Sequence, residues 1–436
     1  MTFATPGTAL IGILVLLLLL TAGTPIGVAL GLVGLAGLAL VIGLEPALIK
    51  SGVVLFHTMS SYELGTLPLF LLMAHLCFAA NASRDIFDAA SAFFGHRRGG
   101  LAIASIAGCA AFGSISGSSL ATATTIGMVA LPEMRRRGYA DGLATASVAA
   151  GGTLGQMVPP SGALIVFGII AEQSIGKLFT ASIVPGITQM LSYFATVWIV
   201  ARLRPGAAPA TERSGWRERW AALGRVADVL ALILVVIGGI ALGWFTPTEA
   251  ASVGATGALL ISAWRGRLSV RTLHTALQET LRTSGLIYLV IIGALIFSVF
   301  VSATGLAETI GHMIGDLGAG RLATVLLMAA FLLLLGSVLD GLALMLLTTP
   351  ILLPVVAQLG LSPIWFGIFL VRAMEIGFIH PPIGMNLYVI HRISGDVPIG
   401  RIFRGVIPFL VADFLHLLLI ILFPMIALAL PELLSQ

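Results

Sequence analysis

Two short segments place a double proline between glycines, inside stretches that are otherwise apolar. GQMVPPSG occupies residues 155–162, and GFIHPPIG occupies residues 377–384. A proline inside a helix removes a backbone donor and clashes with the preceding turn, at a cost of about 3 kcal/mol. In hydrocarbon, irregular backbone persists only where protein or a water-filled cavity satisfies it. We therefore expect each segment to break a transmembrane helix at a functional position.

Each double proline is preceded, in its own half of the chain, by a segment rich in glycine and serine or aspartate. Residues 113–119 read GSISGSS, and residues 336–341 read GSVLDG. Hydroxyl groups and freed carbonyls are hard oxygen ligands that suit a small cation, whereas helix N-termini favour an anionic group. If each segment faces the break of its own half, the four segments form a site for sodium and an organic carboxylate. This assignment is a hypothesis, and transport that persisted unchanged without a sodium gradient would remove its cation half.

The glycine and serine residues also have a structural interpretation, because such clusters often let membrane helices pack closely. GSISG is not a nucleophile elbow of the GxSxG type, because its central residue is Ile115. The chain contains no HExxH and no Walker P-loop. We therefore expect no enzymatic activity, no transition-metal site and no cofactor, with an ion gradient as the source of energy.

Ionisable residues inside apolar segments are functional candidates, because they cost about 2.5 to 3.5 kcal/mol on insertion scales. Asp340 lies where it can ligate a cation or orient a solute hydroxyl. Arg372 and Glu375 stand three residues apart and either neutralise each other or take part in function. His380, directly before Pro381, is a candidate for gating, pH sensing, capping a carbonyl or touching the solute. Packing or interfacial roles are expected for His75, Asp413 and His416.

The composition places these segments in a polytopic membrane protein. Of the 436 residues, 58% are hydrophobic and 10% are charged, against about 25% charged in soluble domains. No positive charge precedes the apolar run 9–20, so we interpret it as a first span and not as a signal peptide. The net charge of +4 is modest, and the positively charged residues cluster in a few short loops, which argues against nucleic-acid binding. Cys77 and Cys109 lack metal or redox spacing and are expected to be inert thiols.

Apolar segments that can span about 30 Å of hydrocarbon position the candidate residues. They lie near residues 7–23, 25–43, 62–80, 140–176, 185–203, 227–245, 247–264, 283–303, 363–392 and 405–430. Two further apolar stretches, 100–134 and 322–357, are interrupted midway by glycine and polar residues. We expect each of these two to form a hairpin.

The chain repeats itself with an offset of 222 residues. Adding 222 to positions in the first half pairs Thr24-Pro25 with Thr246-Pro247, Leu131-Pro132 with Leu353-Pro354, Gly138 with Gly360, Gly155 with Gly377, Pro159-Pro160 with Pro381-Pro382, and Gly162 with Gly384. A collinear series of this kind indicates duplication. We predict a first repeat over 1–203, with a re-entrant hairpin at 100–134 and a broken helix at 140–176; a cytoplasmic linker over 204–226; and a second repeat over 227–436, with a hairpin at 322–357 and a broken helix at 363–392.

Lysine and arginine in short loops indicate the cytoplasmic side. Arginines at 97–98 and 135–137 flank the first hairpin, so both of its ends are expected in the cytoplasm. An odd number of crossings per half inverts the second half, so the second hairpin enters from outside and both termini are expected in the periplasm. The predicted fold is thus an all-α integral membrane protein with an inverted-topology repeat. Its usual setting is a secondary transporter with a site near the membrane midplane.

Several strings resemble the large membrane subunit of TRAP transporters, the tripartite ATP-independent periplasmic systems. They include GSISGSSLATATTIGMVALPEMRRRGYADGLATASVAAGGTLGQMVPPSGALIVFGI, WFTPTEAASVGA and EIGFIHPPIGMNLYVI, and the likeness covers nearly the whole chain. The resemblance implies an elevator-type transporter in the bacterial inner membrane, coupled to sodium and moving carboxylates such as dicarboxylates, sialic acids or keto acids. It also implies two partners, a small membrane subunit and a periplasmic solute-binding protein.

The resemblance also implies roles for individual residues. The first cation site would use Ser114, Ser116 and Gly117, with backbone around Gly155 and Val158. The second would use Gly336, Ser337, Asp340 and Gly341, with backbone around Gly377 and His380. Solute contact is expected from Ser116, Ser161 and Asp340, and the helix breaks from Pro159, Pro160, Pro381 and Pro382. Related sequences often carry threonine in place of His380 and asparagine in place of Ala373, which makes the second break atypical.

Three alternatives compete with this interpretation. One is a stand-alone carboxylate carrier of similar architecture. Another is an intramembrane enzyme, which would need a nucleophile and base or a metal cluster at one depth. The third is a membrane scaffold or receptor without transport. Alanine at Ser116 and at Asp340 separates these classes: lost uptake with intact assembly supports a carrier, whereas lost assembly alone supports a scaffold.

Overall fold

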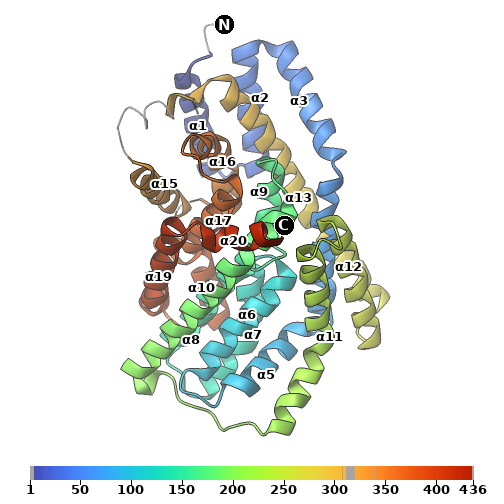
Figure 1. The fold of residues 1–436 in the computed structure, drawn as a ribbon, viewed down its shortest axis with the longest axis vertical. Helices are drawn as coiled ribbons and strands as arrows, with labels where there is room; N and C mark the ends of the chain where they lie inside the picture. The colour runs from blue at the N-terminus through green and yellow to red at the C-terminus, as the bar shows by residue number, and fades with distance from the viewer. Residues whose placement is uncertain (1–3, 307, 311–319, 338, 435–436) are drawn as a thin grey trace.

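The computed structural model describes residues 4–306, 308–310, 320–337 and 339–434, and this part of the chain holds helices and no strand (Figure 1). The helices of the first half are α1 (Pro6–Thr21), α2 (Ile26–Ile42), α3 (Leu44–Met59), η1 (Tyr62–Gly65), α4 (Thr66–Ala79), α5 (Ala82–Phe94), α6 (Gly100–Ser116), α7 (Ser119–Arg136), α8 (Asp141–Met157), α9 (Gly162–Ile170), α10 (Ile175–Leu203) and η2 (Pro205–Ala207). Those of the second half are α11 (Trp216–Ala241), α12 (Pro247–Trp264), α13 (Val270–Ala303), α15 (Arg321–Gly336), α16 (Gly341–Gln358), α17 (Pro363–Ile379), α18 (Met385–Ser394), α19 (Ile399–Leu422) and α20 (Met425–Leu434).

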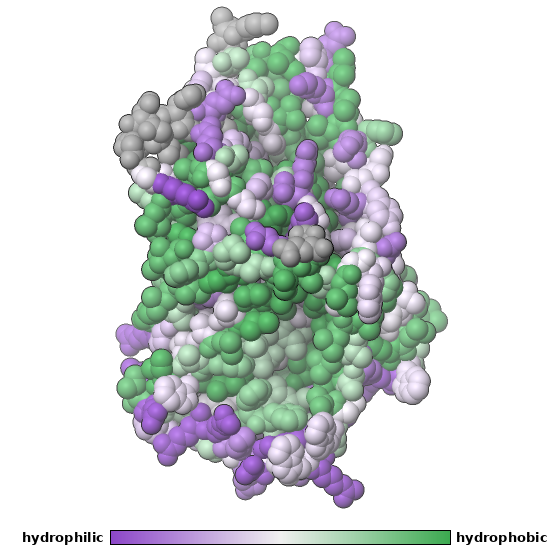
Figure 2. Space-filling view, viewed as in Figure 1, coloured by the Kyte–Doolittle hydropathy of each residue, from purple (hydrophilic) through white to green (hydrophobic). Residues whose placement is uncertain are grey.

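Several helices are long and apolar enough to cross a membrane. Within the described residues there are six such helical stretches, and α8 and α9 form a seventh, bent by 40° at their junction. Hydrophobic side chains cover much of the middle of the face in Figure 2, and hydrophilic ones gather at its lower end. The chain is therefore a multi-pass membrane protein.

Helices α1–α4 and α11–α13 pack together as one group. Its tightest crossing joins α2 to α13, where a Cβ on Gly27 would lie 2.7 Å from the carbonyl oxygen of Leu289. A Cβ on Gly34 would lie 2.6 Å from the backbone nitrogen of Phe297. Only small residues permit such an approach, which is a common way for membrane helices to associate. We call these seven helices the outer group.

The remaining large helices form a second group around α8 and α17. Every residue of α17 from Trp365 to Ile379 is buried, and α8 is buried along nearly all of its length. Around them pack α6, α7, α10, α15, α16, α18 and α19. We call this set, with α9, the core group.

Helix boundaries follow the 222-residue offset of the sequence. Ser119–Arg136 (α7) and Gly341–Gln358 (α16) begin and end 222 residues apart, and so do Asp141–Met157 (α8) and Pro363–Ile379 (α17). Figure 1 shows the hairpin α6–α7 in the lower half of the view and α15–α16 in the upper half. The inverted orientation of the two halves in a membrane stays a prediction.

Some boundaries differ from the sequence-based ones. Helix α11 begins at Trp216, inside the segment 204–226 that is predicted as a linker, and Glu218 Oε2 accepts a hydrogen bond from the backbone N–H of Gly215 at 3.1 Å. The apolar segment 405–430 is two helices, because Pro424 interrupts it. Neither α3 nor α5 was predicted, because charged and polar residues interrupt their apolar runs.

Candidate functional site

The tip of the first hairpin is short. Helix α6 continues through Ser116, Gly117 follows with φ +58°, and Ser118 caps α7 by accepting a hydrogen bond from the N–H of Ala121 at 3.4 Å. The hydroxyls of Ser116 and Thr122 lie 2.7 Å apart. Of the predicted irregular segment 113–119, therefore, only Gly117 and Ser118 lie outside a helix.

The first helix break lies directly against this tip. Residues Val158 to Ser161 separate α8 from α9, and the Pro159–Pro160 peptide is cis. The N–H of Gly162 donates to the carbonyl of Gly117 at 3.2 Å. The structure thus brings together the tip and the break of the first half, as the sequence predicts.

Two glycines allow the hairpin to press against α8. A Cβ on Gly113 would lie 2.7 Å from the Cα of Gly155, and a Cβ on Gly155 would lie 2.7 Å from the carbonyl oxygen of Ser118. Both glycines are inside helices, so they serve close packing and not helix termination. The hydroxyl of Ser114 is bonded within its own helix, to the carbonyl of Ala110 at 3.1 Å.

The second tip and break repeat this arrangement. Helix α15 ends at Gly336, and Asp340 caps α16 by accepting a hydrogen bond from the N–H of Leu342 at 3.1 Å. A Cβ on Gly377 would lie 2.5 Å from the carbonyl oxygen of Gly336. The second break, residues 380–384, contains a cis Pro381–Pro382 peptide.

A small cavity of about 30 Å³ lies between the second tip and the second break. Ser337, Asp340 and Gly341 line it from the tip, Gly377 lines it from the end of α17, and Gly384 lines it from the break. A cavity needs about 10 to 15 Å³ to hold a water, so this one has room for a single small ion. The other lining residues are Gly336, Leu339, Leu344, Met374, Phe378, Ile383 and Met385.

A larger cavity of about 310 Å³ lies against the first tip and break. Its polar lining consists of Ser116, Ser118, Gln156 and Thr283. Backbone and apolar groups complete the lining, from Leu67, Phe70, Leu71, Ile115, Gly117, Pro160, Gly162, Ala163, Ile165, Val166, Leu286, Ile287 and Leu342. Helices α4 and α13 of the outer group therefore form one wall, and the core group forms the other.

The two cavities are held in one unit by contacts between the halves. Leu342, two residues after Asp340, lines the larger cavity. The side-chain amide of Asn386, on α18, donates to Ser119 Oγ at 2.8 Å and to the carbonyl of Ala149 at 3.0 Å. Asn386 thus ties the second break to the hairpin tip and the broken helix of the first half.

Helix N-termini converge on the site. Ser118, Ser161 and Asp340 are the N-caps of α7, α9 and α16, and each accepts a first-turn N–H with its side chain. A helix N-terminus carries a partial positive charge of about half an elementary charge. The neutral lining and these dipole ends favour an anion in the larger cavity, whereas the carboxylate of Asp340 favours a cation in the smaller one.

Two predicted contacts lie elsewhere. Ser161 is buried, and its hydroxyl accepts a hydrogen bond from the N–H of Leu164 at 3.3 Å. Its neighbours Pro160 and Gly162 line the larger cavity, but Ser161 does not. The ring of His380 packs edge-on against Phe414 of α19, with 6.1 Å between ring centroids, and does not line either cavity.

Arg372 and Glu375 belong to a buried ionic cluster outside the two cavities. Arg372 Nη1 lies 2.9 Å from Glu375 Oε2, and its other terminal nitrogen binds Asp413 of α19. All three side chains are fully buried. His416, on the same helix as Asp413, lies 2.8 Å from the hydroxyl of Thr188. The cluster holds α17 against α19, which favours the structural interpretation of the pair.

Sequence reasoning missed Gln156, Thr283 and Asn386. Gln156 lies inside the GQMVPPSG motif, one turn before the double proline, so its position was a usable signal. Thr283 and Asn386 reach the site only through the packing of α13 and α18.

Comparison with known proteins connects this geometry to a family. Residues 13–426 match the family described as tripartite ATP-independent periplasmic transporter, DctM component. The chain is 34% identical to the C4-dicarboxylate TRAP transporter large permease protein DctM of Pseudomonas aeruginosa, over 92% of this chain and 93% of that one. It is 33% identical to the sialic acid TRAP transporter large permease protein SiaM of Vibrio cholerae, over 95% and 96%. The ectoine TRAP transporter large permease protein TeaC of Halomonas elongata is 29% identical, over 84% and 85%.

Two solved structures share the fold at low identity. The Alcanivorax borkumensis YdaH transporter aligns with a TM-score of 0.57 at 16% identity, over 96% of this chain and 98% of that one. Neisseria gonorrhoeae MtrF, described as one of a class of antimetabolite efflux pumps, aligns with a TM-score of 0.56 at 13% identity, over 87% and 84%. These likenesses concern the fold alone.

Proposed function

The chain belongs to the tripartite ATP-independent periplasmic transporter family, as its DctM component. On that premise we propose that it carries an organic carboxylate into the cell, driven by an inward sodium gradient. The named relatives are permeases, so we assign the chain no enzymatic role. The observation that carries the proposal is the pairing of each hairpin tip with the helix break of its own half, each pair next to a cavity.

The small cavity is the proposed site of one sodium ion. Asp340 supplies a charged oxygen there, Ser337 a hydroxyl, and the chain around Gly336 and Gly377 supplies carbonyls. Hard oxygen ligands of this kind suit a small cation. A second ion is proposed at the first tip and break, with the hydroxyls of Ser114 and Ser116 and the backbone around Gly117, Gly155 and Val158 as its ligands. There the carbonyl of Gly117 accepts a hydrogen bond from Gly162, and Gly155 packs against the carbonyl of Ser118.

The larger cavity is the proposed solute site, and its position supports an elevator mechanism. One wall belongs to the outer group, through α4 and α13, and the other to the core group that carries both tips and both breaks. If the core group slides against the outer group, the solute and the ions move with it, as alternating access between repeats requires.

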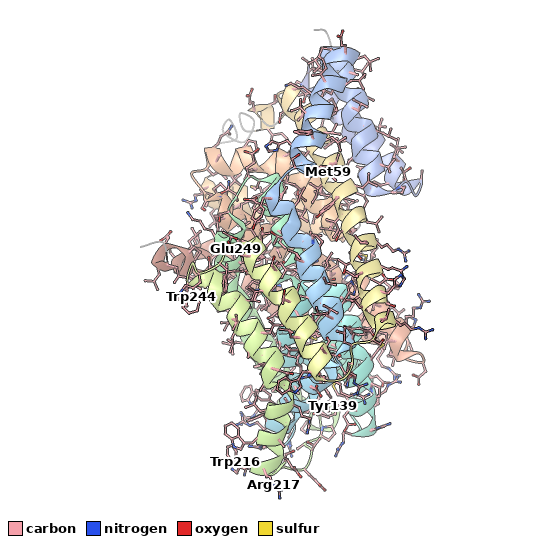
Figure 3. All side chains as sticks on the ribbon, turned by 90° about the vertical axis from the view of Figure 1, so that its right-hand side faces the viewer. Met59, Tyr139, Trp216, Arg217, Trp244 and Glu249 are labelled. Atoms are coloured by element: carbon pink, nitrogen blue, oxygen red, sulfur yellow. The ribbon has the colours of Figure 1, made fainter. Side chains whose placement is uncertain are left out.

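The positive charges support the proposed orientation in the inner membrane. Figure 3 places Trp216 and Arg217, at the start of α11, near the lower end of the molecule, with Tyr139 at a nearby level and Trp244 and Glu249 far above. Tyr139 lies two residues after the arginine run 135–137. Both basic segments thus lie toward one end, which we propose is cytoplasmic, with the two termini in the periplasm.

Two partners are proposed from the family. The family description names a tripartite, periplasmic system, so we propose that a small membrane subunit completes the permease and that a periplasmic solute-binding protein delivers the solute. The exposed apolar side chains of α3, such as Leu48, Val53 and Phe56, are available to the bilayer or to that subunit.

The test is uptake by the reconstituted tripartite complex. Uptake of a panel of labelled carboxylates into proteoliposomes is measured under two conditions. One condition has an inward sodium gradient, and the other has an equal inward potassium gradient in its place. We expect uptake only with sodium, and at least a tenfold loss in Ser116→Ala and in Asp340→Asn with the complex still assembled. The matched controls are Ser252→Ala on α12 and Asp88→Asn on α5, which lie outside both cavities. Equal uptake in potassium would refute sodium coupling.

A further inference from the structure

We infer that the solute is a monocarboxylate with an apolar body, and that a dicarboxylate or a polyhydroxylated sugar acid is excluded by the lining of the larger cavity. The inference rests on the proposed function, because it takes that cavity as the solute site. It adds a solute class that the names of the relatives, which range from C4-dicarboxylate and sialic acid to ectoine, do not settle.

The first step is the charge of the lining. Among the described residues that line the larger cavity there is no arginine, lysine, histidine, aspartate or glutamate. The polar side chains are two serines, one threonine and one glutamine. A dicarboxylate would bring two negative charges into this lining, and burying an unpaired charge is far more costly than burying a hydrogen-bonded polar group.

The second step is that one carboxylate has a place. Ser118 and Gly162 lie where α7 and α9 begin, so they meet two positive dipole ends, and Ser116, the last residue of α6, adds a hydroxyl beside them. These donors gather at one end of the lining, at the first tip and break. A single carboxylate can be neutralised there without a cationic side chain.

The third step is the opposite wall. Leu67, Phe70 and Leu71 come from α4, and Leu286 and Ile287 come from α13. Thr283 is the one polar side chain that these two helices contribute to the lining. Hydroxyl groups of a sugar acid would face this wall largely without partners, whereas a hydrocarbon group would pack against it.

The size agrees with a substantial apolar group. A cavity of about 150 Å³ lined by apolar side chains holds a benzene molecule. The larger cavity, at about 310 Å³, has twice that volume. It therefore has room for a phenyl ring or a branched aliphatic chain together with the carboxylate.

Gln156 points to a substituent beside the carboxylate. It lines the cavity next to the first break, and its buried Oε1 has no hydrogen-bond partner. Because the two ends of an amide are interchanged by a flip, the side chain offers either an acceptor or a donor. A 2-hydroxy or 2-oxo group would use it, so a 2-hydroxy or 2-oxo acid with an apolar side chain fits the lining.

The experiment measures ligand binding to the permease without the solute-binding protein, because that protein applies its own selection. The melting temperature of the purified complex of the two membrane subunits is measured in sodium buffer and in potassium buffer. Each measurement is made with 4-methyl-2-oxopentanoate, phenylpyruvate, succinate or N-acetylneuraminate. We expect the first two to raise the melting temperature in sodium only. Succinate and N-acetylneuraminate should bind at least tenfold more weakly.

A pair of isosteric variants tests the cavity itself. Val166→Thr exchanges a methyl group for a hydroxyl in the cavity wall, and Val229→Thr makes the same change at an equally buried position on α11, outside the cavity. We expect Val166→Thr to weaken binding of phenylpyruvate about tenfold and Val229→Thr to leave it unchanged. The expected size is at the lower end of the roughly 10- to 200-fold by which one methylene of a substrate changes discrimination in an apolar pocket.

The outcomes separate the inference from the proposed function. Sodium-dependent binding of succinate or N-acetylneuraminate as tight as that of the apolar acids overturns the solute class and leaves the proposed function standing. Equal binding of phenylpyruvate by Val166→Thr and Val229→Thr overturns the assignment of this cavity. Absence of sodium-dependent binding and of uptake for every carboxylate refutes the proposed function as well.

Discussion

Replacing Gly377 with alanine should separate the second hairpin tip from the second break. The new Cβ would lie 2.5 Å from the carbonyl oxygen of Gly336 and 2.9 Å from its carbon, whereas ordinary contact begins at 3.4 Å. The carbonyl of Gly336 must therefore retreat by roughly 0.9 Å. Because these neighbours are backbone atoms of another helix, a side-chain rotation cannot relieve the overlap.

The expected cost is set by two opposing effects. Alanine in a helix is about 1 kcal/mol more favourable than glycine. Overpacking a tight interior costs about 1 to 3 kcal/mol. Gly336 lines the small cavity, and metal sites tolerate displacements of about 0.2 Å. We therefore expect modest loss of stability but at least a tenfold loss of sodium affinity, which corresponds to about 1.4 kcal/mol.

The assay is the sodium concentration that half-maximally raises the melting temperature of the purified complex, with sodium-driven uptake measured in parallel. Gly238→Ala on α11 is the matched control, because a Cβ there meets nothing within 4 Å. It should keep wild-type sodium dependence and gain slightly in stability. If Gly377→Ala and Gly238→Ala showed the same half-maximal sodium concentration, the second tip and break would not form a cation site.

Three further predictions follow from buried contacts. Asp413→Asn leaves Arg372 with one carboxylate in a fully buried cluster, and breaking a buried ion pair costs up to about 3 to 5 kcal/mol. The melting temperature should therefore fall sharply, while the folded protein keeps its sodium affinity. Asn386→Ala removes the hydrogen-bond donor to Ser119 and to the buried carbonyl of Ala149, and leaving such groups without a partner costs about 1 to 3 kcal/mol of stability. This variant should lower both the melting temperature and the sodium affinity. Arg265→Gln removes a guanidinium that binds Asp85 at 2.6 Å and also Asp228 of α11, so protease cleavage between α4 and α5 should accelerate with unchanged sodium binding.

The sequence allowed the helix breaks to be predicted because the effect of proline is local. Pro159-Pro160 and Pro381-Pro382 interrupt helices in the structure, where the motifs place them. The membership in a transporter family is likewise confirmed by the family match over residues 13–426. Helix α7 and helix α16 also begin at the positions that the 222-residue offset relates.

The extent of the tips was harder to predict, because glycine has two uses. The segment 113–119 was interpreted as irregular, yet α6 continues through Ser116. Its Gly113 lets the hairpin approach Gly155 and does not end the helix. Local sequence does not distinguish a glycine that breaks a helix from one that lets two helices touch.

Contacts between distant elements carried no sequence signal. The i,i+3 spacing suggested that Arg372 and Glu375 form a pair, but Asp413, 41 residues further on, completes the cluster. The leucines and isoleucines of α4 and α13 look like lipid-facing residues until packing places them around the larger cavity. The inferred solute class therefore rests on the packing of these helices and not on the sequence.

We propose that each pair of tip and break holds a sodium ion, and equilibrium binding of sodium-22 to the purified complex measures this occupancy. Wild type should bind at least two ions. Asp340→Asn should lose the ion of the small cavity and keep the other, and Ser116→Ala should show the reverse. Sodium binding by both variants at the wild-type stoichiometry and affinity would show that the tips and breaks do not hold the ions.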